Sequence, residues 1–240
     1  MTPEQEFSES INLFLRDIWK DVIDSFKESI QVLYDNQINS VEKLLNAIAD
    51  QAMDMDVRMC ACWLAGKIDY VDSDFALLVA SKDENAKLRY EAIIALGTWN
   101  RNTPDVIKRL TVALLTDDDI DVRKVSAYSL GMIANIDSLK VLEEVLNNQE
   151  EDVGVRGQAA ESLADFHNHS VVPSLINNLS DKSAEVRFWC AYTLGQIGAK
   201  EALPTLTKLV GQDHAKFKGS YAGRTVSQEA EYAIEAINQI

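Results

Sequence analysis

The 240-residue sequence is poor in basic residues. Lys and Arg together number 23 against 38 Asp and Glu, so the formal net charge is −15. Such a charge repels phosphate backbones and removes the electrostatic contribution that usually dominates nucleic-acid affinity, which argues against nucleic acid as a partner. A protein partner with a basic surface fits better, because opposite charges speed encounter and disfavour wrong partners.

Long apolar segments and paired cysteines are also missing. No stretch approaches eighteen apolar residues, and the acidic N-terminus lacks the basic and apolar regions of a secretion signal. The three cysteines, Cys60, Cys62 and Cys190, are odd in number and lack a C-x-x-C spacing. This usage indicates buried thiols in a reducing compartment. We therefore predict a cytoplasmic protein that does not contact membranes.

Motifs for catalysis or cofactor binding are absent as well. The sequence contains no G-x-S-x-G, no Walker loop and no H-E-x-x-H. The segment His167-Asn168-His169 has no nearby cysteine, and it is more typical of a polar turn than of a zinc site with four protein ligands. The sequence predicts no metal, no cofactor and no enzymatic activity.

What the sequence does contain is a repeat. An apolar residue followed by arginine recurs five times, with successive arginines 31, 34, 33 and 31 residues apart. A small residue follows each arginine by three positions, leucine usually follows by seven, and glycine usually follows by eight. The five dipeptides are Val57-Arg58, Leu88-Arg89, Val122-Arg123, Val155-Arg156 and Val186-Arg187.

This pattern describes a helix that packs closely against its neighbours and ends where the glycine weakens it. Second amphipathic segments, such as 141–146 and 173–179, lie between these helices, so each repeat is a helix pair. Such pairs bury their apolar faces only by stacking into a curved rod with a concave and a convex side. We expect the arginines to bond to acids and carbonyls of the adjoining turns.

The two ends of the chain depart from the repeat. Residues 4–34 are amphipathic without its signature, so we predict an N-terminal helical cap at 1–36 and a single continuous repeat domain at 37–240. In the last repeat Val226 follows Val186 by 40 residues, and the surplus at 211–224 is predicted to form a loop.

The segments 121–131 and 185–198 resemble the bacterial HEAT-like repeats first associated with phycobilisome lyases. The resemblance implies an all-α class, an alpha–alpha superhelix (HEAT-repeat solenoid) of about five to six helical-hairpin repeats. The broad family includes adaptors, bilin lyases or their chaperones, a diiron hydroxylase and DNA glycosylases. The hydroxylase branch uses His-Glu dipeptides as metal ligands, but here no histidine precedes glutamate; the glycosylase branch presents a basic surface, but this chain is acidic.

Two groups of residues are candidate partner sites. Aromatic residues lie near the fifth position after each arginine, and we expect them to form a column on the concave face. The alternative is that these rings fill gaps between repeats. Trp189 is the ring most expected to be buried. That aromatic column comprises Trp63, Tyr90, Tyr128, Phe188, Tyr192 and Tyr232. The second group lies in the C-terminal loop and combines positively charged and aromatic side chains: Lys216, Phe217, Lys218, Tyr221 and Arg224. The alternative is that this loop is a solvated segment without a binding role.

The function that these features favour is a non-catalytic scaffold or adaptor that grips another protein on its concave face, with the loop as a clamp. Two alternatives remain open at this point. The chain could be an acidic immunity or inhibitor protein against a basic toxin, or a bilin lyase or chaperone for chromophore attachment.

Overall fold

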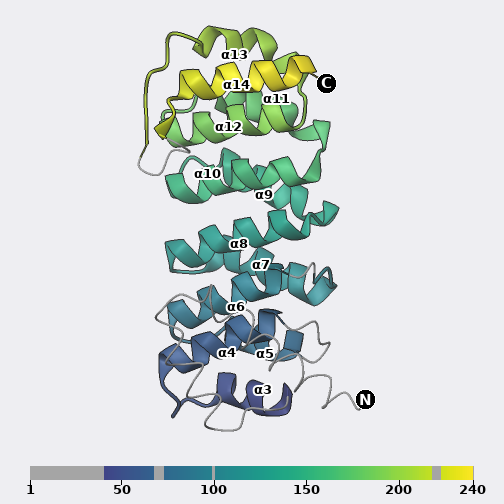
Figure 1. Cartoon of the computed structure of the whole chain (residues 1–240), viewed down its shortest axis with the longest axis vertical. Helices are drawn as coiled ribbons and strands as arrows, with labels where there is room; N and C mark the ends of the chain where they lie inside the picture. The colour runs from purple at the N-terminus through teal and green to yellow at the C-terminus, as the bar shows by residue number, and fades with distance from the viewer. Residues whose placement is uncertain (1–40, 68–72, 99–100, 218–222, 240) are drawn as a thin grey trace. The chain divides into compact units, whose positions relative to one another are not determined.

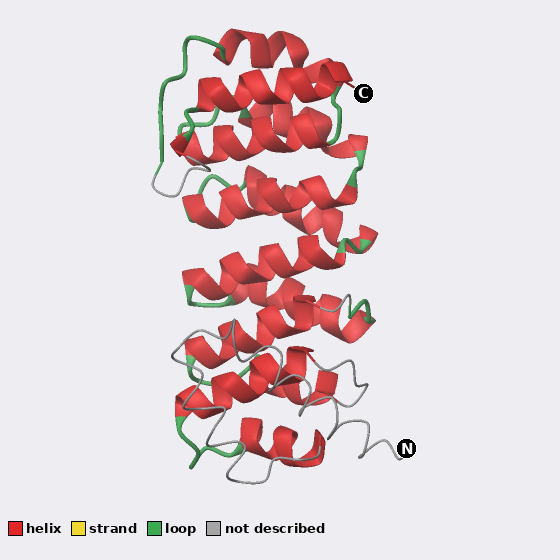
Figure 2. Ribbon diagram, in the orientation of Figure 1, coloured by secondary structure: helices red, strands yellow, loops and turns green. Residues whose placement is uncertain are grey.

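The computed structural model describes residues 41–67, 73–98, 101–217 and 223–239, and every regular element in these ranges is a helix (Figure 2). The cap predicted at 1–36 lies outside the described residues. The chain divides into two compact units, unit 1 (Met1–Arg109) and unit 2 (Leu110–Ile240). Whether residues 37–240 form one continuous domain stays a prediction.

The helices come in consecutive pairs; the helices of a pair are joined by a short turn, except that a long connection at 210–225 joins α13 and α14. Unit 1 contains α3 (Val41–Ala49), α4 (Met55–Lys67), α5 (Ser73–Ala80) and α6 (Ala86–Thr98), and α7 (Pro104–Thr116) crosses into unit 2. Unit 2 continues with α8 (Ile120–Ile133), α9 (Leu139–Asn147), α10 (Val153–Ser162), α11 (Val172–Asn178), α12 (Ala184–Gln196), α13 (Leu203–Leu209) and α14 (Val226–Gln239). Short 3-10 turns lead into or out of several of them: η1 (Ile136–Ser138), η2 (Leu163–Phe166), η3 (His169–Val171) and η4 (Lys200–Ala202).

The arginine of the repeat lies on the second helix of each pair, here called the B helix. In unit 2 the B helices α8, α10, α12 and α14 pack in succession, and α9, α11 and α13 pack against α10, α12 and α14 (Figure 1). The described part of the chain is therefore all-α and built from the helical hairpins of a solenoid-type fold, as predicted. No helix in the described ranges is long and apolar enough to cross a membrane.

The repeated glycine lies in the last turn of its helix, near the helix end as predicted, and it also makes a close packing contact that was not predicted. A Cβ on Gly195 would lie 2.8 Å from the Cα of Ala233 on α14, and one on Gly66 would lie 2.8 Å from the Cβ of Ala95 on α6. Glycine is needed because consecutive B helices approach too closely for a larger side chain. On α8 the chain turns back three residues after Gly131, where Ala134 adopts a left-handed φ of 49°.

The repeated arginines join consecutive repeats, which confirms their predicted structural role. Arg58 donates to the carbonyl of Ile48 and pairs with Asp83 of the next repeat at 2.8 Å. Arg156 makes the corresponding bonds to the carbonyl of Leu146 and to Asp181. Burial would raise the pKa of Asp181, but hydrogen bonds from Arg156 and its other partners outweigh burial and hold the pKa below its ordinary value.

Candidate functional site

The B helices of unit 2 carry rings and carboxylates on one shared face. Tyr128, Glu161, Tyr192 and Tyr232 occupy the equivalent position on the four successive helices α8, α10, α12 and α14. Together with their neighbours they define the acidic–aromatic face: Tyr128, Glu161, Asp165, Glu185, Trp189, Tyr192 and Tyr232. Three of these rings were predicted as members of the aromatic column, and each is exposed or half-buried.

Trp189 is the central ring of this face. It stands edge-on to Tyr192, with ring centroids 5.5 Å apart and planes at 86°. It also leans onto α10 at Gly157, where a Cβ would lie 3.1 Å from the Cδ1 of Trp189 and 3.0 Å from the Cγ of Glu185. The absence of a side chain at Gly157 therefore sets how closely ring and carboxylate approach α10.

Two carboxylates of the face, Glu161 and Glu185, are partly withdrawn from water. Burial raises the pKa of Glu161, with a smaller contribution in the same direction from the Asp165 charge and an opposing one from Lys124. Burial likewise raises the pKa of Glu185, and Lys124 again opposes the shift. A half-buried carboxylate has lost part of its hydration, so a cation brought beside it is attracted more strongly than at an open surface. Sequence reasoning missed these acids, because charge within an amphipathic helix looks like an ordinary solvated face.

Phe188, another predicted member of the column, has no exposed surface while Arg224 and Phe217 lie against its ring. Its ring is fully buried, whereas Trp189, expected to be the most buried ring, is partly exposed. The cause is the connection between α13 and α14, since Phe217 packs against Phe188 with ring centroids 5.4 Å apart. Phe217 also lies 6.3 Å from Trp189. The loop and the column, predicted as separate sites, therefore meet.

The other predicted loop residues divide between this cluster and the surface. Arg224 places its guanidinium carbon 4.7 Å from the ring centroid of Tyr232 and 5.9 Å from that of Phe188. Its Nη1 lies 2.9 Å from Oε2 of the buried Glu229. Lys216 is exposed, and the predictions at Lys218 and Tyr221 lie outside the described residues.

In unit 1 the remaining column residues, Trp63 on α4 and Tyr90 on α6, are both half-buried. These two helices pack against each other, so the rings belong to adjacent B helices as the repeat predicts. The binding role of the column and of the loop stays a prediction for all of these residues.

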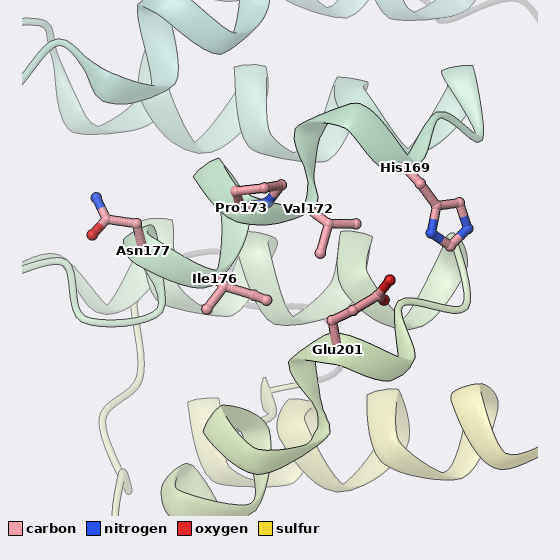
Figure 3. A pocket seen from close by; sticks show the side chains of 6 residues that line it. All are labelled: His169, Val172, Pro173, Ile176, Asn177 and Glu201. Atoms are coloured by element: carbon pink, nitrogen blue, oxygen red, sulfur yellow. The ribbon is translucent and has the colours of Figure 1, made fainter.

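An open groove of about 520 Å³ lies at another edge of unit 2 (Figure 3). Val172, Pro173 and Ile176 of α11 supply its apolar lining, and His169 and Glu201 stand together at one end (Figure 3). Both polar side chains are exposed to solvent. The groove therefore lacks the buried, convergent polar groups that fix a small ligand.

The described residues contain no group of three or more His, Cys, Asp or Glu side chains placed to hold a metal ion. The segment around His167 instead completes a turn: His167 adopts a left-handed φ of 46° after η2, and Asn168 accepts a hydrogen bond from the Ser170 N–H at 2.9 Å. These residues do not fit a diiron site of the hydroxylase kind.

Comparison with known proteins identifies HEAT repeats at residues 73–154 and 148–219, which together make up more than half of the chain. The chain is also 34% identical over 152 residues to deoxyhypusine hydroxylase of Candida glabrata, with 52% of this chain and 47% of the relative covered. It thus spans about half the length of the curated relative that it matches.

Two solved structures are similar in fold alone. The phycocyanin lyase complex of CpcE and CpcF from Nostoc sp. PCC7120 matches with a TM-score of 0.56 and 21% identity, covering 72% of this chain and 71% of the other. YibA of Escherichia coli matches with a TM-score of 0.51 and 18% identity, covering 97% of this chain and 98% of the other.

The similarity to deoxyhypusine hydroxylase overturns the prediction that the chain is not an enzyme. That prediction depended on missing metal-ligand dipeptides and catalytic motifs. A relationship carried over 152 residues of helical repeat does not need those dipeptides, so their absence could not exclude an enzyme as a relative.

Proposed function

Because the chain belongs to the HEAT repeat family, we propose that it binds a protein partner, and that the acidic–aromatic face of unit 2 takes up a basic segment of that partner. The observation that carries the proposal is the juxtaposition of half-buried carboxylates with partly exposed rings. Glu161 and Glu185 supply the carboxylates, and Trp189 and Tyr192 supply the rings beside them.

The chemistry of this face suits Lys and Arg side chains. Aromatic faces attract cations within about 6 Å of the ring centroid, and Arg stacks on them while bonding to a carboxylate. The net charge of −15 adds long-range attraction that speeds encounter with a basic surface. An acidic inhibitor of a basic toxin is a special case of the same proposal.

The test uses a fluorescein-labelled peptide of alternating Arg, Lys and Gly residues, with binding followed by fluorescence anisotropy. The double variant Glu161→Gln/Glu185→Gln removes two carboxylates from the face with little change in shape. We expect it to bind the peptide about tenfold more weakly, which corresponds to about 1.4 kcal/mol. Affinity should also fall as salt rises, because the attraction is electrostatic.

The matched control is Asp137→Asn/Glu150→Gln, which removes the same charge from exposed turns of unit 2. If both double variants weaken binding equally, net charge alone is responsible and the face is not the site. A pull-down from native lysate with the wild-type protein and both double variants then identifies the partner, which should be lost with the face variant alone.

The sequence similarity to deoxyhypusine hydroxylase favours a second candidate, the hydroxylation of a similar substrate. Since the described residues offer no metal-binding group, no step through a metal is derived from them. The purified protein, supplied with ferrous iron, dioxygen, a two-electron reductant and a deoxyhypusine-bearing peptide, should add one oxygen atom to the peptide, the second leaving as water, if this candidate holds. Absence of that mass change, together with no retained iron, would remove it.

A further inference from the structure

The connection between α13 and α14 is anchored without the help of Arg224. Asp213 accepts two hydrogen bonds from Arg187, and the backbone N–H of Ser227 donates to the carbonyl of Asp213 at 2.8 Å. The N–H of Val226 donates to the carbonyl of Ala215 at 3.1 Å. These bonds hold both ends of the connection against α12 and α14 and do not involve the Arg224 side chain.

Arg224 occupies a setting built for a guanidinium. Its planar cation lies over Tyr232 and Phe188 and within 2.9 Å of the Glu229 carboxylate. The two rings contribute aromatic faces, and the carboxylate contributes the opposite charge. A planar, weakly hydrated cation satisfies both at once, and the compact ammonium of Lys stacks less well.

Arg224 does not satisfy the hydrogen-bonding capacity of Glu229. Glu229 is 3% exposed, and within the described part of the chain its buried Oε2 makes no hydrogen bond despite the nearby Nη1 of Arg224. Burial raises the pKa of this carboxyl, and the Arg224 charge opposes the shift. A buried carboxylate oxygen without a hydrogen bond is costly, so a guanidinium with better geometry would be bound more favourably.

The residues around Arg224 are continuous with the acidic–aromatic face. Tyr232 is 54% exposed and belongs to that face, while Phe188 touches Trp189 with ring centroids 5.3 Å apart. A basic segment lying along the face would therefore bring one of its side chains to Tyr232 and Glu229.

We propose that Tyr232, Phe188 and Glu229 form a guanidinium subsite, occupied within the chain by Arg224 and taken over by an arginine of the partner. This inference rests on the proposed function for the origin of the incoming arginine. Arg224 then acts as an internal competitor. Because it is tethered, its effective concentration is high, and it lowers the apparent affinity for any external arginine.

The experiment titrates L-arginine amide and L-lysine amide into ¹⁵N-labelled protein and follows chemical shifts in α14. We expect Arg224→Gln to bind arginine amide at least about fivefold more tightly than the wild type does, and to prefer it over lysine amide. Adding Tyr232→Ala to Arg224→Gln should abolish that binding. Lys208→Gln, which removes an exposed charge from α13, is the matched control and should behave as the wild type.

Each failure has its own signature. If Arg224→Gln binds arginine amide no better than the wild type does, or shows no preference over lysine amide, the subsite is excluded even where the basic peptide binds. If the basic peptide fails to bind any protein but arginine amide binds Arg224→Gln, the proposed function fails and the subsite stands. Circular dichroism of every variant ensures that a loss of binding is not a loss of fold.

Discussion

Arg187 and Asp213 form a two-point ion pair in which Nε donates to Oδ2 at 2.6 Å and Nη2 donates to Oδ1 at 3.1 Å. Asp213 is the counterpart of Asp83 and Asp181, the acids that receive the arginines of earlier repeats. The last repeat therefore keeps the arginine–acid bond and departs from the pattern only after Asp213. Each such bond ties a B helix to the turn of the following repeat.

Replacing Asp213 with Asn should destabilise unit 2 by about 1–3 kcal/mol, because the Arg187 guanidinium would lose its charged partner in a largely buried position. Urea denaturation followed by circular dichroism measures the change. Glu150→Gln in an exposed turn provides the control and should shift the midpoint little. Equal midpoints for the two variants would show that the ion pair contributes nothing to stability.

The stability of the protein should be highest in mildly acidic solution. Despite burial, hydrogen bonds and nearby positive charge hold the pKa of Asp83, Asp181 and Asp213 below the ordinary value, so their stabilisation is complete above about pH 4 and is lost as pH falls further. Burial raises the pKa of Glu161 and Glu229, whose contribution is complete below about pH 4 and is lost as pH rises through the raised values.

The two groups of acids together predict a melting temperature that rises as pH is lowered from 7 to about 5 and falls below about 4. The variant Glu161→Gln should flatten the rise, because its side chain cannot gain a proton. Melting curves across this range, at constant ionic strength, provide the measurement. A melting temperature that fell steadily from pH 7 to 5 would contradict the assignment of raised pKa values.

Replacing Gly195 with Ala should destabilise unit 2 by about 1–3 kcal/mol. The new Cβ would lie 2.8 Å from the Cα of Ala233, which is backbone and cannot swing away, so α12 and α14 would have to separate. Gly154→Ala is the matched control, since its Cβ would meet side-chain atoms at 3.2 Å or more. There the gain in helix propensity, up to about 1 kcal/mol, should make the change neutral or stabilising. Chemical denaturation measures the free energy of unfolding of both variants. A Gly195→Ala variant as stable as Gly154→Ala would contradict the close packing of α12 and α14.

The three cysteines should resist thiol reagents in the folded protein. Cys60, Cys62 and Cys190 are fully buried, and burial raises the pKa of the Cys60 thiol to about 12. Burial also raises the pKa of the other two, so reactive thiolate is scarce at neutral pH. Labelling with a disulfide reagent should modify none of them without denaturant and all three in guanidinium. Mass mapping then distinguishes Cys190 in unit 2 from the pair in unit 1, and rapid labelling of any native thiol would contradict its burial.

The amino-acid sequence determined the helical hairpins, their order and the structural role of the arginines. These features depend on contacts within one repeat or with the next one, so the same local pattern recurs in each repeat and can be recognised without coordinates. Arg58 and Arg187, for example, each find an acid that lies about one repeat further along the chain. Even in the divergent last repeat, the acid that receives Arg187 stands where the spacing places it.

The tertiary structure decided what lies on the surface of the B helices. Phe188 is buried because Phe217 packs on it, and Arg224 lies over Tyr232 because the connection is anchored beside α12 and α14. Gly195 proved to be a packing contact with Ala233 on the next B helix as well as a residue near the helix end. None of these outcomes follows from periodicity, because each depends on how closely two separate segments approach in space.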